Sequence, residues 1–324
     1  MSNNITVSEI AGKLLNCSDV LLLCHTNPDE DTAGSAYALC LALESAGKKV
    51  RIACDKKPPR KSAGFIDASR FENDLQAEDG TLVVSVDVAS VGMLGSLCDR
   101  FSQRVDIRID HHAVSEEFAH FNYNRPDASA TALIAYEIIT EMGVVLDGAI
   151  ASSLYAALAA DTGGFRYSNT TAQAHRVAAD LIEHGAEYVG VSEALFETKT
   201  RSNLRAYRLG IEKLDYLYGG RAALLVITND DKRANSLTDE DLDALSSLTR
   251  QSEGTELGLL LKQSDENEQK FKLSLRSRSS FDCAEFCSRF GGGGHVRAAG
   301  ASIYADSPEQ ARRKLLALLS EYKV

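Results

Sequence analysis

The feature that most constrains the fold is a series of short, continuous apolar runs in the first half of the chain. The runs are Val20–Cys24, Val50–Ala53, Leu82–Val86 and Val105–Ile109, with a weaker candidate at Phe118–Tyr123. Strands buried on both faces show continuous rather than alternating apolar residues, and such strands are typical of parallel sheets. Helical patterns separate or follow the runs at 34–47, 129–142, 147–160 and 171–184. This order predicts an α/β fold with a doubly wound, mainly parallel sheet in residues 1–188.

The second half of the chain predicts a smaller α/β domain. A polar helical segment at 189–218 is expected to link the two halves. Beyond it, strands are expected at 222–228, 257–262, 271–276 and 301–304, and helices at 239–249, 282–290 and from Pro308, where Ser307 can cap the helix. Since 324 residues are about twice the usual ~100–150-residue domain, we predict a domain at 1–188, a linker at 189–218 and a domain at 219–324.

Charge and composition limit the partners. Lys and Arg number 35 against 46 Asp and Glu, a net charge of −11, which is the wrong sign for a protein that coats long duplex nucleic acid. Any nucleic substrate should therefore be short. No apolar stretch approaches the ~20 residues of a membrane span, and the start lacks a secretory pattern, so we expect no membrane partner and a cytoplasmic protein. The seven cysteines form no CxxC pair and are expected to be thiols.

Aspartates and histidines follow three of the apolar runs. The first run leads to His25, Asp29 and Asp31, the third to Asp87, and the fourth to Asp110-His111-His112; Asp161 ends the small-residue helix before Thr162-Gly163. Carboxyl ends of parallel strands converge on one crevice, so these side chains should meet there. Taken singly, Asp29 or Asp31 could cap the following helix, and either histidine could be a satisfied core residue. Together, carboxylates and imidazoles without thiolates predict a site for divalent ions such as Mn²⁺ or Mg²⁺.

These motifs resemble the DHH phosphoesterase superfamily, and length and motif set are most similar to its branch of nano-RNases (bifunctional oligoribonucleases) and pAp phosphatases. The resemblance rests on His25-x-x-Pro-Asp29-x-Asp31, Asp87, Asp110-His111-His112 and Asp161-Thr-Gly, and on Gly291-Gly-Gly-Gly-His295 through Gly300, which is similar to the signature of the associated DHHA1 domain. It covers nearly the whole chain. Glu30 departs from the pattern, because many members have glycine there, and it adds charge beside the site.

The resemblance implies roles for individual residues. His25 and Asp29 would hold one metal ion, Asp31, His111 and Asp161 a second, and Asp87 would bridge the two. His112 would face the substrate as a catalytic group, and Asp110 would orient His111. We expect Mn²⁺, with Mg²⁺ and Co²⁺ as alternatives. Two such ions would lower the pKa of a shared water and hold the hydroxide in line with phosphorus.

The glycine-rich segment of the second domain is predicted to bind a phosphate. Consecutive glycines allow backbone N–H groups to converge on an anion. Arg276 and His295, together with Gly292, Gly293 and Gly294, are the predicted substrate contacts, and the resemblance points to Arg276 and His295 for a terminal phosphate. A flexible linker with solvated basic residues is the alternative interpretation.

The predicted function is hydrolysis of short oligoribonucleotides and of 3′-phosphorylated nucleotides such as pAp. The partner would be short single-stranded RNA or a nucleotide. A homodimer is possible, since the sequence does not decide the oligomeric state. Three alternatives are a phosphodiesterase for cyclic dinucleotides or their linear products, a processive DNA exonuclease, and an inorganic pyrophosphatase. From a different class comes a nucleotide sensor that does not turn over its ligand. A sensor could lose a ligand residue freely, whereas all six predicted metal ligands are present.

Overall fold

The computed structural model describes residues 3–242, 244–278 and 281–323. The chain divides into two compact units, 1–198 and 199–324. The division falls inside the segment 189–218, which was predicted to be a linker. The exact domain boundaries remain a prediction. That segment holds no single helix: it contains α7 (Tyr188–Ser192), one π-helical turn η4 (Glu193–Glu197) and α8 (Arg201–Lys213).

The first unit is built on a seven-stranded sheet in which every neighbouring pair is parallel, in the order β1-β7-β6-β5-β2-β3-β4. Its strands are β1 (Asn3–Asn4), β2 (Asp19–Leu23), β3 (Lys49–Ala53), β4 (Phe71–Glu72), β5 (Leu82–Val86), β6 (Ile107–Asp110) and β7 (Phe121–Asn124). Its helices are α1 (Val7–Asn16), α2 (Glu30–Ser45), α3 (Cys98–Phe101), α4 (Thr131–Glu141), α5 (Gly148–Asp161), α6 (Ala172–Glu183) and α7, with 3₁₀ turns η1 (Arg60–Ser62), η2 (Ala68–Arg70) and η3 (Val91–Leu97).

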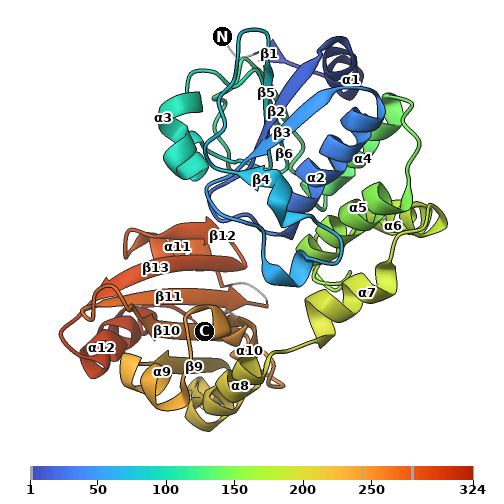
Figure 1. Cartoon of the computed structure of the whole chain (residues 1–324). Coiled ribbons are helices and arrows are strands. Elements are labelled where there is room, and N and C mark those ends of the chain that lie inside the picture. Colours follow the sequence, from blue (N-terminus) through green and yellow to red (C-terminus); the bar gives the residue numbers. More distant parts are fainter. Residues whose placement is uncertain (1–2, 243, 279–280, 324) are drawn as a thin grey trace. The chain divides into compact units, whose positions relative to one another are not determined.

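Helices cover both faces of this sheet, so the doubly wound parallel architecture is confirmed. Helices α1, α2 and α4 pack on one face and α3 with η3 on the other (Figure 1). Each face has its own apolar core, which explains why the central strands show continuous apolar runs. Helix α5 packs closely against α2: a Cβ added at Gly34 would lie 2.7 Å from the Ser153 carbonyl oxygen.

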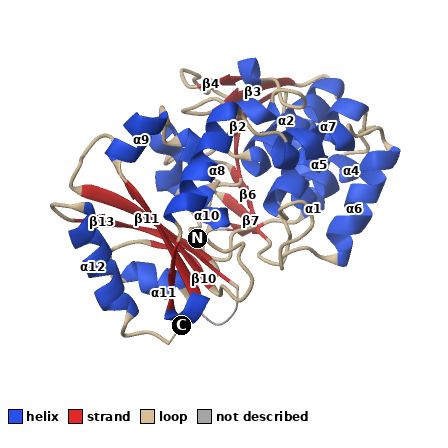
Figure 2. Cartoon of the chain, turned by 90° about the horizontal axis from the view of Figure 1, so that it is seen from below, coloured by secondary structure: helices blue, strands red, loops and turns tan. Residues whose placement is uncertain are grey.

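The second unit has a six-stranded mixed sheet in the order β12-β13-β11-β10-β9-β8. Strands β9 and β10 are parallel, and the other neighbouring pairs among the described strands are antiparallel. Its elements are β8 (Asp215–Leu217), β9 (Ala222–Ile227), β10 (Leu257–Gln263), β11 (Lys270–Ser277), β12 (Gly293–His295), β13 (Ala298–Tyr304), α8, α9 (Asn229–Asn235), α10 (Leu245–Leu248), α11 (Cys283–Ser288) and α12 (Pro308–Leu319), with 3₁₀ turns η5 (Tyr218–Gly220) and η6 (Glu240–Leu242). Helices α11 and α12 cover one face and α8 and α10 the other (Figure 2).

Several observed elements of the second unit differ from the predicted ones. The helix expected at 239–249 consists of the two short pieces η6 and α10, and α9 was not predicted although Thr228 and Asp231 form its capping box. The Ser307 cap of α12 is confirmed, since its side chain accepts from the Gln310 N–H. All seven cysteines are free thiols. Among the helices that the structure describes, none combines the length and apolar character needed to span a bilayer.

Candidate metal centre

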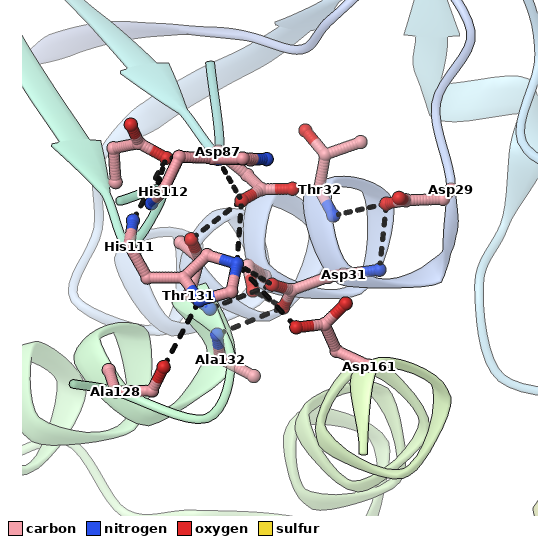
Figure 3. Close-up of polar contacts among 12 residues, drawn as sticks. Asp29, Asp31, Thr32, Asp87, His111, His112, Ala128, Thr131, Ala132 and Asp161 are labelled. Atoms are coloured by element: carbon pink, nitrogen blue, oxygen red, sulfur yellow. Dashed lines mark hydrogen bonds and ion pairs between the residues drawn. The ribbon is translucent and has the colours of Figure 1, made fainter. Parts of the chain in front are cut away.

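The site lies at the carboxyl edge of the parallel sheet, where the direction of chain progression reverses. From β2 the chain moves outward to β3 and then returns to β5 on the other side of β2. Ligands bind at such switch points in open α/β sheets. Strand β2 leads to His25–Asp31, β5 to Asp87 and β6 to His111 and His112, and the end of α5 adds Asp161. Figure 3 shows Asp29, Asp31, Asp87, His111, His112 and Asp161 gathered there. The fold therefore brings these residues together at one edge of the sheet, as predicted.

The potential ligand atoms form three groups, and within each group they lie within 4.8 Å of one another. His25, Asp29 and Asp87 make the first group and Asp31, His111 and Asp161 the second. Asp87, His111 and His112 make the third, which shares Asp87 with the first group and His111 with the second. Asp87 reaches toward the first and the second group: its Oδ2 lies 4.0 Å from His25 Nε2 and its Oδ1 lies 3.7 Å from His111 Nε2. These first two groups coincide with the two ligand sets that the resemblance implied, and the ligand roles themselves stay a prediction.

Asp29 and Asp31 are held in place by helix N-termini. Asp29 is the N-cap of α2 and accepts from the N–H groups of Asp31 and Thr32, each at 3.1 Å. Asp31 accepts from the N–H groups of Thr131 at 2.7 Å and Ala132 at 3.0 Å, at the start of α4 (Figure 3). The capping interpretation is thus correct for Asp29, whereas Asp31 lies in the first turn of α2 and binds the N-terminus of α4 instead; neither contact excludes a metal role. Helix N-termini stabilise negative charge, so the capping fixes both carboxylates beside the site.

Asp87 adopts an uncommon backbone conformation. Its φ of 60° lies in the left-handed region, which aspartate tolerates better than most residues. Its N–H donates to the Ile109 carbonyl at 2.9 Å, and its Oδ1 accepts from the Thr131 hydroxyl at 2.8 Å. The turn directs the side chain into the site just after β5 ends. Thr131 was not predicted as a site residue, although it opens the helical pattern that follows Ser129.

The two neighbouring histidines are oriented differently. His111 Nδ1 lies 3.1 Å from the Ala128 carbonyl, which makes it the donor, and its Nε2 faces Asp31, Asp87 and Asp161 at 3.5–3.7 Å. This is the arrangement of a metal-ligating imidazole. His112 instead turns Nδ1 to Asp110, 2.7 Å away. Its Nδ1 is also the nitrogen nearest Asp87, at 3.7 Å, so that nitrogen is engaged as a donor.

The prediction that Asp110 orients the His111 ring is wrong. Asp110 accepts from the His111 backbone N–H at 2.9 Å but from the ring of His112. Alternate residues of an extended chain point to the same side, so Asp110 aligns with His112 rather than with its direct neighbour. The carbonyl of Ala128, which no local motif marks, takes the orienting role for His111.

Arg108 is a further residue that the sequence analysis did not assign. It is 1% exposed, and its Nη1 donates to Asp110 Oδ2 at 2.5 Å while its Nε donates to Asn122 Oδ1 at 3.3 Å. A buried carboxylate needs a partner, and Arg108 supplies it. Its signal in the sequence was an arginine between Ile107 and Ile109 of the predicted strand, two residues before Asp110.

Three carboxylates of the site, those of Asp31, Asp87 and Asp161, have raised pKa values, chiefly because they are buried beside one another. Burial, followed by the charges of Asp87 and Asp161, raises the pKa of Asp31 well above its usual value. Burial and the Asp29 charge raise the pKa of Asp87, and burial with the Asp87 charge raises that of Asp161 to about 6. Burial opposes the imidazolium of His112, but Asp110 and Asp87 outweigh it and raise its pKa to about 9. Bound cations would relieve this repulsion.

The raised carboxyl pKa values predict a pH dependence for metal-free protein. A carboxyl whose pKa is higher in the folded than in the unfolded chain stabilises the fold at low pH, and this stability is lost as the pH rises through the folded value. In EDTA, we therefore expect the urea midpoint of the wild type to fall between pH 4 and pH 7, since the pKa of Asp161 is raised from 3.8 to about 6. Asp161→Asn should remove on the order of 2 kcal/mol of this decline. Parallel pH curves for the two proteins would contradict the prediction.

The predicted substrate residues of the second unit lie around β12 and β13. Arg276 and His295 both pair in register with Ala298, one from each side; the side chain of His295 lies outside the described part of the structure. A Cβ at Gly294 would lie 2.6 Å from the Ala298 carbonyl, and one at Gly292 would clash with the Gly300 carbonyl. Gly293 begins β12. The glycines therefore permit close strand approach, and phosphate binding by Gly292–Gly294 stays a prediction.

Comparisons with known proteins agree with this architecture. The family model of the DHH family N-terminal domain matches residues 19–161, and the DHHA1 domain model matches residues 222–323. A bifunctional oligoribonuclease and PAP phosphatase, NrnA, of Thermus thermophilus is 29% identical over 93% of this chain and 89% of its own. A probable manganese-dependent inorganic pyrophosphatase of Streptococcus pyogenes is 27% identical over 65% of this chain and 71% of its own.

Among solved structures, an exopolyphosphatase-related protein of Bacteroides fragilis superposes with a TM-score of 0.89 at 20% identity, covering 98% of this chain and 96% of its own. This likeness concerns the fold. The two matched domain models follow each other along most of the chain, and the motifs that carry the resemblance all lie at the site or on β12 and β13. The chain therefore contains a DHH family N-terminal domain followed by a DHHA1 domain.

Proposed function

We propose that this protein is a divalent-metal-dependent phosphoesterase that hydrolyses short oligoribonucleotides and 3′-phosphorylated nucleotides such as pAp. The observation that carries the proposal is Asp87, whose two oxygens face two separate groups of carboxylates and imidazoles. Such a pair of groups suits two-metal phosphoester chemistry. The substrate class is supported by the printed name of the Thermus thermophilus relative.

The donor set fits a pair of divalent ions. His25, Asp29 and Asp87 would hold one ion, and Asp31, His111, Asp161 and Asp87 the other. All donors are carboxylate oxygens or imidazole nitrogens, which suits Mn²⁺ and Mg²⁺. We favour Mn²⁺ because the pyrophosphatase relative is named as manganese-dependent. When bound, such ions lower the pKa of coordinated water and neutralise charge on a phosphate.

The residues around the metal groups have distinct tasks in this proposal. Asp110, itself neutralised by Arg108, holds the His112 ring and favours its protonated form. A protonated His112 can donate a hydrogen bond to the substrate phosphate or a proton to the leaving oxygen. Thr131 fixes the Asp87 carboxylate, and the Ala128 carbonyl fixes the His111 tautomer.

A substrate panel tests the proposal. Dinucleotides to pentanucleotides, pAp, cyclic dinucleotides and pyrophosphate should be assayed with Mn²⁺ and with Mg²⁺, and kcat/KM compared. We expect the highest values for the short oligoribonucleotides and pAp, and none after chelation. Preference for a cyclic dinucleotide or pyrophosphate would assign the protein to that substrate instead. Tight binding of a nucleotide with no turnover would make it a sensor.

Arg276→Ala tests the substrate role of the second unit. If Arg276 binds a terminal phosphate, the variant should raise KM for 5′-phosphorylated trinucleotides about tenfold, since a charge-assisted contact is lost. The increase in KM should be smaller for the same trinucleotides without the 5′-phosphate. Lys270→Ala removes a positive charge at the other end of β11 and is the matched control. Equal penalties on both substrate forms would show that Arg276 does not bind the terminal phosphate.

A further inference from the structure

The segment after β3 carries four basic residues in six positions. Lys56, Lys57, Arg60 and Lys61 surround Pro58 and Pro59, and we call residues 56–61 the basic loop. Its sequence alone is typical of a solvated loop. In the structure it lies beside the segment after β2, because β2 and β3 are parallel neighbours that end at the same edge of the sheet (Figure 1). That neighbouring segment carries three of the predicted metal ligands.

Contacts join the basic loop to this ligand segment at both ends. Lys56 Nζ donates to Asn27 Oδ1 at 2.7 Å, and Lys61 Nζ lies 3.3 Å from Glu30 Oε2. Asn27 and Glu30 stand on either side of Asp29 in the sequence. Just before the loop, Asp55 accepts from the Thr26 hydroxyl at 2.8 Å. Lys56 and Lys61 therefore contact residues that flank the predicted metal ligand Asp29, and Arg60 directly precedes Lys61 in the chain.

Glu30 fixes the loop in this position. Its side chain is only 6% exposed and accepts from the Ser62 hydroxyl at 3.0 Å in addition to pairing with Lys61. A buried carboxylate is costly without such partners, so Glu30 and the loop stabilise each other. Lys57 Nζ donates to the Phe71 carbonyl, and the two prolines restrict the backbone between. The negative charge that Glu30 adds to the motif is thus paired with Lys61 of the basic loop.

Two loop cations keep their charge available for an anion. Lys56 is exposed, and its partner Asn27 is a neutral amide. Arg60 is exposed and forms no ion pair with any residue that the structure describes. An incoming polyanion would otherwise meet a chain of net charge −11. Cations near a cleft attract anions over about 10 Å at 0.1 M salt.

We propose that Lys56 and Arg60 bind substrate phosphates beyond the scissile one, and so make the protein prefer oligonucleotides to phosphoesters that carry no further phosphate. The inference rests on the proposed function and adds a determinant of substrate length in the first unit. It is independent of Arg276 and the glycine segment, which belong to the second unit.

The test compares Lys56→Ala/Arg60→Ala with wild type on a pentaribonucleotide and on bis(p-nitrophenyl) phosphate, which has no further phosphate. The ratio of the two kcat/KM values should fall about tenfold at 50 mM salt, and the salt dependence of the pentanucleotide reaction should weaken. Lys49→Ala is the matched control, because Lys49 is an exposed lysine at the opposite end of β3. Lys56→Arg/Arg60→Lys, which keeps both charges, should restore the ratio.

Binding supplies a readout that does not depend on turnover. With Ca²⁺ in the carboxylate site, the alanine variant should bind a labelled pentaribonucleotide about tenfold more weakly than wild type. An unchanged ratio and unchanged Kd, or equal losses in Lys49→Ala, would overturn the role of the loop. If wild type hydrolyses no phosphoester, the proposed function fails, while the binding comparison still decides whether the loop holds phosphates.

Discussion

Replacing Asp87 by alanine should lower kcat/KM by about a thousandfold or more, because both metal groups lose a shared donor. One Asp87 oxygen faces His25 of the first group, and the other faces His111 of the second group. Asp87 therefore reaches both groups with a single side chain. Stabilisation by a metal pair is worth several kcal/mol, and each 1.4 kcal/mol corresponds to a factor of ten in rate. Metal content, measured after dialysis against Mn²⁺, should fall below two ions per chain.

A second variant separates lost charge from backbone strain. Asp87 has a φ of 60°, where alanine is disfavoured but asparagine is tolerated. Asp87→Asn should therefore fold with little loss of stability and still lose metal and turnover. Asp74→Ala, which removes the same charge from a 97% exposed side chain, is the control. Calorimetry that finds two ions bound to Asp87→Asn at wild-type affinity would disprove the bridging role.

The fold of the first unit was predictable because its central strands are buried on both faces. Five apolar runs predicted β2, β3, β5, β6 and β7, and the convergence of their carboxyl ends predicted which side chains would meet. Strands β1 and β4 were not predicted, because two-residue edge strands are specified by their neighbours rather than by a local pattern. The helix expected at 239–249 failed for a related reason: short pieces pack on β9 and β10 without a continuous helical face.

Within the site, residue positions could be predicted but the orientation of side chains could not. The sequence places Asp110 beside both histidines, yet only the geometry of an extended chain end selects His112 as its partner. The Thr131 hydroxyl and the Ala128 carbonyl belong to a segment more than 40 residues after Asp87 and about 17 residues after His111. Their roles arise from tertiary packing at the start of α4, which no spacing in the sequence records.

These orientations predict that the two histidines respond differently to substitution. His111→Ala removes a nitrogen that faces three carboxylates and should cost one bound ion. His112→Ala should keep both ions, because the nitrogen nearest the metal groups is already engaged by Asp110. It should nevertheless lower kcat by about 10²–10⁴-fold, the range for loss of a general acid.

We expect His112→Ala to fold as stably as the wild type, so a change in its kcat would not reflect unfolding. Without the ring, Asp110 still accepts from Arg108 and from the His111 backbone N–H, so its buried charge stays paired. Metal analysis and kcat should be measured on the same preparations, with a pH profile for each variant. The wild type should lose activity at alkaline pH as the His112 imidazolium, which Asp110 stabilises, loses its proton, and His112→Ala should lack that decline. An ion missing from His112→Ala but present in His111→Ala would mean that the ligand and the acid have exchanged roles.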